Sequence, residues 1–261
     1  MYNIAVIKII FFDCDGTLVC FDNPHIRPAV VDSLKKIHEQ GIKLIIATGR
    51  APWSVSVFDE APFDGLMAFN GSYCFDEKGI ILSNPLDHDD LNIIIDNATK
   101  MGHCIEACNE KRHSTNGYEA DLLEYIGIAH VEPKINDHFD ELIQGDVYQL
   151  NIAARRPEYS SLLEGTSHTR IVDWWPKACD VIPKEGGKGR AVQAILDHYG
   201  FSKGEALAFG DGANDLDMFY ACATSIAMGN ADAEVQTHAS WVSDTVENDG
   251  IVSGLKKYGL L

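Results

Sequence analysis

Reactive side chains follow three apolar stretches of this sequence. The stretch 4–10, continued by Phe11 and Phe12, leads to two aspartates, 42–47 leads to a threonine, and 206–209 leads to a Gly-Asp-Gly turn rich in acids. A lysine also stands where a helical pattern begins. These groups are Asp13, Asp15, Thr48, Lys188, Asp211, Asn214 and Asp215.

The elements that must position these groups follow from the apolar patterns. Short runs rich in Val and Ile are typical of strands buried on both faces of a parallel sheet. Helical spacing follows the first strand from Pro28 to Gln40, and a second helix follows Lys188. Ligands of open α/β sheets bind beyond the carboxyl ends of the strands, so we expect the reactive groups to meet at one edge.

The grouped charges predict phosphate chemistry. Asp13, Asp15 and Asp211 repel one another unless a cation lies between them, and Mg²⁺ is the usual ion for all-oxygen ligation. Lys188 at a helix N-terminus adds a site that favours anions. A carboxylate in line with a bound phosphorus can attack it, and a second carboxylate two residues away can protonate the leaving oxygen.

The pattern changes in the middle of the chain. Residues 73–75 and 80–82 form a hairpin pattern, after which helices and strands no longer alternate regularly. The expected elements there are a helix at 89–100 and strands at 103–108, 147–154, 169–175 and 178–182. We therefore predict an α/β fold with a doubly wound parallel-sheet core, residues 1–82 and 185–261, and an inserted α+β domain, residues 83–184.

Composition excludes several classes of partner. The net charge of −18 and the pI near 4.8 argue against nucleic acid and anionic membranes. Seven cysteines without a Cys-x-x-Cys spacing predict a reduced, cytoplasmic protein. The opening apolar run is too short to span a membrane and lacks a small-residue cleavage site, so we expect no signal peptide.

Four motifs carry a family resemblance that covers the whole chain in order. They are Asp-Cys-Asp-Gly-Thr, Ala-Thr-Gly-Arg, Gly-Gly-Lys-Gly and Gly-Asp-Gly-Ala-Asn-Asp-Leu-Asp-Met, beginning at residues 13, 47, 186 and 210. Together they resemble the motifs of the haloacid dehalogenase-like (HAD) hydrolase superfamily. The large insertion between the second and third motifs resembles the cap of its Cof-type sugar-phosphatase branch.

The resemblance implies a role for each motif residue. It implies Asp13 as nucleophile and Asp15 as general acid/base, with Mg²⁺ as cofactor. The remaining implied roles are phosphate or substrate binding by Thr48, Gly49, Lys188 and Asn214, and Mg²⁺ binding by the Asp13 carboxylate, the Asp15 backbone carbonyl and Asp211, with Asp215 in support.

Several residues have two interpretations. Asn70 and Gly71 line the substrate pocket, as the branch suggests, or form a plain hairpin turn. Arg50 contacts substrate or pairs with an acid. Arg112 and His113 belong to a polar loop, 109–117, which is more often solvated than bound to a ligand. The acidic run 87–90 favours a helix cap over a metal site.

The predicted function is a Mg²⁺-dependent phosphatase for small phosphorylated metabolites, with sugar phosphates as the favoured substrates. The inserted domain would close over the site as a cap and choose the substrate. A phosphomutase that passes the phosphoryl group to a second hydroxyl is the alternative enzyme. A phospho-switch module, like the receiver domains of response regulators, is the alternative that is not an enzyme. Receiver domains are about half as long as this chain. We expect a monomer or a small homo-oligomer.

Overall fold

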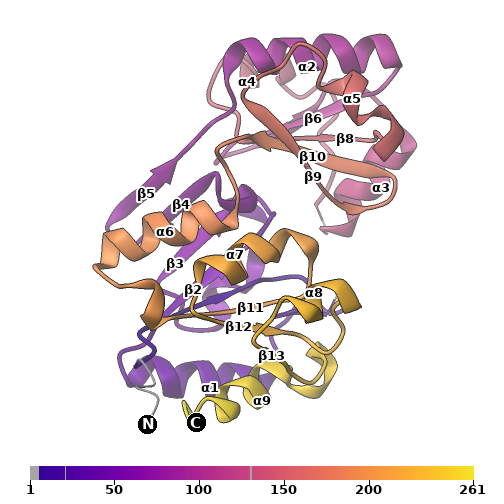
Figure 1. Cartoon of the computed structure of the whole chain (residues 1–261). Helices are drawn as coiled ribbons and strands as arrows, with labels where there is room; N and C mark the ends of the chain where they lie inside the picture. The colour runs from indigo at the N-terminus through magenta and orange to yellow at the C-terminus, as the bar shows by residue number, and fades with distance from the viewer. Residues whose placement is uncertain (1–5, 21, 130) are drawn as a thin grey trace.

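The strands of the chain form two sheets. The computed structural model describes residues 6–20, 22–129 and 131–261. One sheet has eight strands in the order β13-β12-β11-β1-β2-β3-β4-β5, and the other has five in the order β7-β6-β8-β10-β9. The eight-stranded sheet and its helices form the larger unit, and the five-stranded sheet and its helices form the smaller unit, drawn above it in Figure 1.

The larger sheet is parallel except for a hairpin at one edge. Its parallel strands are β1 (Ile9–Phe12), β2 (Lys43–Ala47), β3 (Gly65–Ala68), β11 (Ala206–Gly210), β12 (Thr224–Ala227) and β13 (Trp241–Val242). The hairpin consists of β4 (Tyr73–Asp76) and β5 (Gly79–Ser83), which pair antiparallel with β3 and with each other. This arrangement confirms the predicted α/β class.

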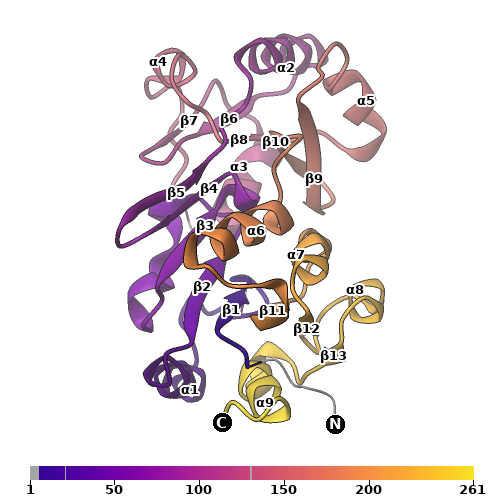
Figure 2. The same cartoon turned by 60° about the vertical axis from the view of Figure 1, so that its left-hand side comes forward.

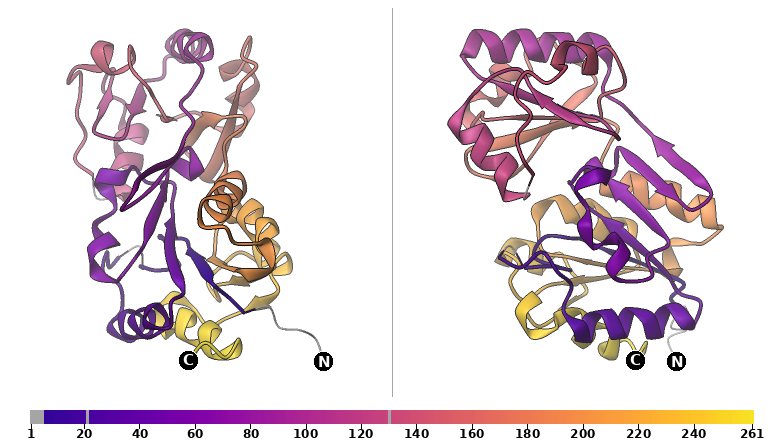
Figure 3. Two further views of the ribbon diagram at one scale, coloured as in Figure 1. Left: turned by 90° about the vertical axis from the view of Figure 1, so that its left-hand side faces the viewer. Right: turned by 180° about the vertical axis from the view of Figure 1, so that it is seen from behind.

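Helices cover both faces of this sheet. Successive strand residues point to opposite faces, so Ile10 and Phe12 pack with α1 (Pro28–Glu39) and α9 (Gly250–Lys257). Ile9 and Phe11 pack on the other face with α6 (Lys188–Tyr199), α7 (Leu216–Ala221) and α8 (Ala233–Thr237). Burying one such side chain contributes roughly 1.5–3 kcal/mol. Figures 2 and 3 show the two helical layers.

The smaller unit is an antiparallel sheet with helices on one face. Its strands are β6 (Ile105–Cys108), β7 (His113–Thr115), β8 (Gln149–Ile152), β9 (Thr169–Trp175) and β10 (Ala178–Pro183). The helices α2 (His88–Met101), α4 (Phe139–Leu142) and α5 (Tyr159–Leu162) share one apolar core with alternate residues of β6, β8 and β10. The remaining helix, α3 (Ala120–Ile128), packs against Ala153.

Short 3₁₀ turns connect many of these elements. They lie at Pro52–Ser54, Ser56–Glu60, Phe69–Gly71, Arg156–Glu158, Lys203–Glu205, Ala213–Asp215 and Val246–Asn248. Two of them, Phe69–Gly71 directly after β3 and Ala213–Asp215 two residues after β11, carry side chains of the site described below. In the described ranges, no helix combines the length and the apolar character that crossing a bilayer requires.

The first strand differs from the predicted one. We expected it over the apolar run 4–10, but β1 covers Ile9–Phe12, while residues 1–5 lie outside the described ranges. The strand reaches Phe12 because Ile9–Phe12 pair with both β2 and β11 in the middle of the sheet. Asp13 therefore follows the last paired residue without an intervening loop.

The predicted polar loop 109–117 was also wrong in part. Its residues His113–Thr115 form β7, which pairs with β6, and all three side chains are buried. This strand could not be predicted from an apolar pattern, because all three of its residues are polar. His113 is tolerated there because its Nδ1 lies 2.5 Å from Glu106 Oε1, which satisfies both groups.

Candidate active site

The predicted reactive groups meet at the carboxyl edge of the larger sheet. Asp13 follows β1, Thr48 follows β2 and Asp211 follows β11, and these strands are neighbours. The Asp13 N–H donates to the Phe209 carbonyl at 2.9 Å, which extends the ladder past the end of β1. The parallel topology therefore brings together groups that are almost 200 residues apart in sequence.

Lys188 is the buried cation of this edge. Its Nζ lies 2.6 Å from Asp13 Oδ1 and 2.6 Å from Asp215 Oδ1, and its side chain is 0% exposed. The lysine begins α6, directly after Gly187, whose φ of 122° a residue with a Cβ rarely adopts. A charge this deep requires both partners, because an unpaired buried ammonium is very costly.

Asp215 holds the loop that follows β11. Its Oδ2 accepts the backbone N–H groups of Asp211 and Gly212, both at 3.0 Å, while its Oδ1 accepts from Lys188. The side chain is fully buried. One carboxylate thus fixes the position of the acidic loop relative to the buried lysine.

Asp211 accepts hydrogen bonds from two side chains and lies against a glycine. Thr17 Oγ1 donates to its Oδ1 at 3.2 Å, and Asn230 Nδ2 donates to its Oδ2 at 3.2 Å. Gly16 has a φ of +80°, and a Cβ there would collide with the Asp211 carboxylate. Glycine at position 16 is therefore required both by its backbone and by this close approach.

The pKa values of the site reflect crowded negative charge. Burial and the charge of Asp215 raise the pKa of Asp13 well above its ordinary value, although Lys188 opposes them. Burial and Asp215 also raise the pKa of Asp211 to about 7. Burial lowers the pKa of Lys188, but the charges of Asp13 and Asp215 outweigh it and the pKa is raised. Lys188 thus stays charged, and the carboxyls of Asp13 and Asp211 favour a second cation in addition to it.

The donor set suits a hard divalent cation. Asp13, Asp211 and Asp215 each offer a carboxylate oxygen, and these oxygens lie within 4.8 Å of one another. Oxygen-only ligation is the preference of Mg²⁺, and burial together with the charge of Asp215 raises the pKa values of Asp13 and Asp211, so a cation between these carboxylates would relieve their repulsion. The residues present therefore fit a Mg²⁺ site.

Arg50 pairs with an acid, as one of its two interpretations predicted. Its Nε donates to Asp15 Oδ2 at 2.8 Å and its Nη2 to Asp15 Oδ1 at 2.5 Å, a bidentate arrangement. The Arg50 side chain is mostly buried and the Asp15 side chain is half-buried. Arg50 therefore fixes the direction of the Asp15 carboxylate beside Asp13.

Thr48 and Gly49 form a tight turn after β2. Thr48 is buried, and its Oγ1 accepts the Arg50 N–H at 3.0 Å. A Cβ at Gly49 would lie 3.1 Å from the Asn70 side chain, so the turn packs closely against Asn70. Thr48 and Gly49 line the same cavity as Asp13 and Asp15.

Asn70 joins the two units. It lies in the turn after β3 with a φ of 52°, and its Oδ1 accepts from Asn214 Nδ2 at 3.2 Å. Its Nδ2 donates to Asp180 Oδ2 at 3.0 Å and to Gln149 Oε1 at 3.2 Å, both in the smaller unit. Asn70 is therefore not only a turn residue, because its side chain connects the two units.

Gly71 and Lys188 lie behind the cavity wall. Gly71 has a φ of +92°, and a Cβ there would collide with the Gly187 carbonyl, so Gly71 packs against the turn that carries Lys188. Neither residue is among those that line the cavity. The sequence left open whether Gly71 lines the substrate pocket or forms a plain turn, and in the structure it packs against the turn that carries Lys188.

A cavity of about 750 Å³ lies between the two units. From the larger unit it is lined by Asp13, Asp15, Thr48, Arg50, Asp211 and Asn214, among others. From the smaller unit it is lined by residues of β6, β8, β9 and β10 and by α3. Such a volume suits a metabolite-sized ligand.

Four polar residues of the smaller unit were missed in the sequence. Glu106, Gln149, Asn151 and Asp180 line the cavity and are buried. Their signal was present, because each stands between apolar residues in a strand, as in Cys-Asp-Val or Gln-Leu-Asn-Ile. Alternation of this kind predicts a sheet with one polar face. Asn230, which bonds Asp211, had no signal of its own.

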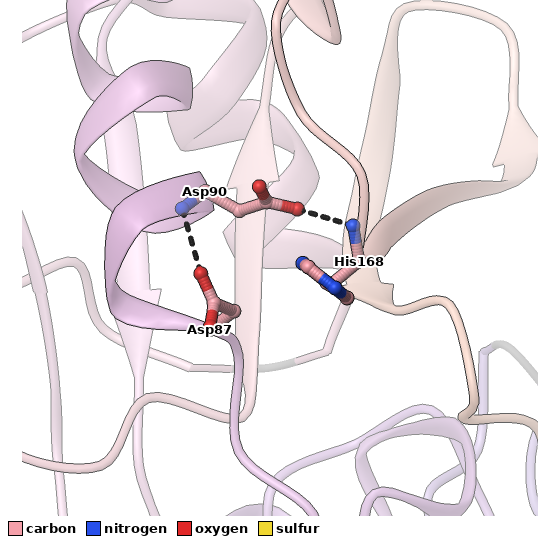
Figure 4. Close-up of side chains that lie close together, drawn as sticks. All are labelled: Asp87, Asp90 and His168. Carbon is pink, nitrogen blue, oxygen red and sulfur yellow. Dashed lines mark hydrogen bonds between the residues drawn. The ribbon is translucent and has the colours of Figure 1, made fainter.

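A second acidic group lies far from the cavity. Asp87 Oδ1 accepts the N–H groups of Asp89 and Asp90 at 3.0 and 3.1 Å, which confirms the predicted cap of α2. Asp90 Oδ2 accepts the N–H of His168 at 2.6 Å (Figure 4). Asp90 also accepts from Ser167, so its carboxylate ties α2 to the loop before β9.

The chain is similar to known phosphatases over nearly its full length. The family model of haloacid dehalogenase-like hydrolases matches residues 10–255. The putative phosphatase YkrA of Bacillus subtilis is 29% identical over 257 residues, which cover 97% of this chain and 98% of YkrA. These matches confirm the resemblance carried by the four motifs.

Solved structures agree with the fold. A haloalkanoate-superfamily phosphatase, BT1666 of Bacteroides thetaiotaomicron, superposes with a TM-score of 0.92 at 28% identity, covering 100% of this chain and 98% of that one. The subclass IIB sugar phosphatase BT4131 superposes with a TM-score of 0.88 at 28% identity, covering 97% and 100%.

Proposed function

The chain belongs to the haloacid dehalogenase-like hydrolase family and is a phosphatase, and we propose that it hydrolyses small phosphorylated metabolites, sugar phosphates first, with Mg²⁺. The observation that carries the proposal is the buried pairing of Lys188 with Asp13 and Asp215 beside Asp211. That arrangement leaves carboxylates that still favour a cation, next to a cavity large enough for a metabolite.

In the first proposed step, Asp13 is the nucleophile. One of its carboxylate oxygens attacks the phosphorus of the substrate, and the bond from phosphorus to the leaving oxygen breaks. Asp15, whose two oxygens accept from Arg50 in the structure, must leave this pair and take up a proton before it can give that proton to the leaving oxygen. The products of this step are the free alcohol and an aspartyl-phosphate at Asp13.

In the second step, water replaces the alcohol. Asp15 now takes a proton from the water, whose oxygen attacks phosphorus and releases Asp13 from inorganic phosphate. Thr48, Gly49 and Asn214, which line the cavity, bind the phosphate oxygens, and Lys188 orients the Asp13 carboxylate. Positioning and charge neutralisation supply most of the rate enhancement in such reactions.

Asp13, Asp211 and the backbone carbonyl of Asp15 would hold Mg²⁺, with Asp215 in support. A bound Mg²⁺ neutralises the charge of the transferring phosphoryl group and of these carboxylates. The contacts of Asp215 with Lys188 and with the backbone of 211–212 keep the acidic loop in place for it.

We assign the role of a substrate-selecting cap to residues 83–184, and the chemistry to residues 1–82 and 185–261. The contacts that support this division are those of Asn70 with Asp180 and Gln149 across the cavity. All seven cysteines are free, in keeping with a reducing, cytoplasmic location.

The function is tested by phosphate release from a panel of phosphorylated metabolites. Release should require Mg²⁺, stop with a chelator and be lost in Asp13→Asn. Release that persists in Asp13→Asn would refute the proposed nucleophile. Formation of a phosphate isomer without free phosphate would show a phosphomutase instead.

A further inference from the structure

A row of polar side chains faces the cavity from the smaller unit. Glu106 on β6, Asn151 on β8 and Asp180 on β10 lie opposite one another across three neighbouring strands, and Gln149 lies on the same face. Glu106, Gln149, Asn151 and Asp180 are 2, 5, 8 and 1% exposed and all line the cavity. We call these four residues the roof.

The roof is held rigid by hydrogen bonds. Asn151 Nδ2 donates to Glu106 Oε2 at 2.5 Å, and Gln149 Nε2 donates to Asn151 Oδ1 at 2.9 Å. The Tyr125 hydroxyl donates to Asp180 Oδ1 at 2.5 Å. The two amides and the two carboxylates are therefore oriented before any ligand arrives, which lowers the entropic cost of binding one.

The roof lies close to the phosphate end of the cavity. Asn70 spans the distance between them, since it accepts from Asn214 and donates to Asp180. A substrate whose phosphate lies beside Asn214 and Asp13 will therefore place a leaving group of sugar size against the roof.

The charge of the roof is negative and weakly compensated. Glu106 contacts His113 on β7, whose Nδ1 lies 2.5 Å from Glu106 Oε1. The arginines among the described cavity-lining residues are already bound to carboxylates, in the pairs Arg50–Asp15, Arg155–Asp121 and Arg156–Asp173. An anionic leaving group would meet two buried carboxylates without an uncommitted arginine to receive it.

Asp180 is the roof carboxyl whose ionised form a bound ligand can stabilise. Burial raises its pKa to about 7, even though hydrogen bonds from Tyr125 and Asn70 favour the ionised form. Additional donors to the Asp180 oxygens would stabilise the carboxylate further. Hydroxyl groups of a bound ligand are such donors.

We infer that the roof selects uncharged, hydroxyl-rich leaving groups and rejects those with a second phosphate or a carboxylate. This inference deepens the proposed phosphatase function and rests on it. Hydroxyl groups donate to Asp180 and Glu106 and accept from Gln149 and Asn151, whereas a second anion is placed beside like charge at low dielectric.

The test compares matched substrates that differ in one anionic group. The pairs are glucitol 6-phosphate with 6-phosphogluconate, and fructose 6-phosphate with fructose 1,6-bisphosphate. We expect kcat/KM to favour the uncharged member roughly 100-fold in the wild type, because like-charge contacts in such sites are strongly unfavourable. In Asp180→Asn the preference should fall roughly tenfold, because one of the two roof charges is removed.

Matched controls separate the possible outcomes. Asp96→Asn makes the same change on the exposed side of α2, away from the cavity, and should keep the wild-type preference. Should Asp180→Asn fail to fold, Glu106→Gln tests the same ratio. Equal kcat/KM within each pair would overturn the roof inference. Hydrolysis of p-nitrophenyl phosphate that needs Asp13 would then show that the phosphatase function still stands, and failure to hydrolyse any of these esters would overturn both.

Discussion

Replacing Lys188 by methionine should strongly destabilise the protein when no divalent cation is present. Methionine nearly matches the volume of lysine, so the substitution removes the charge without opening a large cavity. The lost contacts are the two 2.6 Å pairs with Asp13 and Asp215, whose side chains are 9% and 0% exposed. Removing one partner of a buried ion pair costs about 3–5 kcal/mol, because the remaining charge stays buried and uncompensated.

The measurement is urea unfolding at equilibrium in a chelator, followed by fluorescence. Lys184→Met is the control, because Lys184 is exposed just before α6 and its loss should change the free energy of unfolding by no more than about 0.5 kcal/mol. The destabilisation of Lys188→Met should grow as the pH rises, because burial raises the pKa of Asp13 and protonation of this carboxyl, which relieves the loss at lower pH, is then no longer possible.

Mg²⁺ should restore part of the lost stability. A dication that binds the folded variant reduces the repulsion among Asp13, Asp211 and Asp215. A loss of less than about 1 kcal/mol in chelator at pH 8 would refute the reasoning, since it would mean that these carboxylates do not need the buried ammonium.

Three further predictions concern stability. Mg²⁺ at about 100 times its Kd should stabilise the wild type by about 2.7 kcal/mol, and Asp211→Asn should lose most of this gain in thermal unfolding with and without the ion; an equal gain would exclude Asp211 as a ligand. The pKa of Asp180 is near 4 in the unfolded chain and about 7 in the folded one, so protons favour the folded state and the free energy of unfolding should fall by up to about 4 kcal/mol from pH 4 to pH 7. Urea midpoints across this range should be flatter in Asp180→Asn, and unchanged curvature would contradict the raised pKa. Gly71→Ala should cost about 1–3 kcal/mol more than Gly41→Ala, because both residues have φ near 90° but only Gly71 meets a backbone carbonyl; equal urea midpoints would show that the contact relaxes.

The catalytic edge was predictable because local patterns and topology agree there. The strand ends at Asp13, Thr48 and Asp211 are visible as apolar runs that stop at polar residues, and parallel pairing then forces them together. Lys188 was predictable because a glycine pair and a helical pattern mark its place at the start of α6. Its complete burial between two carboxylates was not visible, since it depends on the loop after β11.

The roof was harder to predict because its meaning depends on what the sheet faces. Asp180 and Asn151 alternate with apolar residues, which indicates one polar strand face, but solvent is the usual neighbour of such a face. Only the position of the smaller unit over the cavity turns that face into a lining. The bidentate pairing of Arg50 with Asp15 likewise depends on how two loops meet.

The most direct test of the proposed mechanism is to look for a phosphoryl group on Asp13. The protein would be mixed with Mg²⁺ and a substrate from the panel, quenched in acid within one turnover, digested and measured by mass spectrometry. The mechanism predicts a phosphorylated peptide that contains Asp13, absent in Asp13→Asn and absent in chelator. Phosphate release at an undiminished rate by folded Asp13→Asn, with no modified peptide in the wild type, would contradict it.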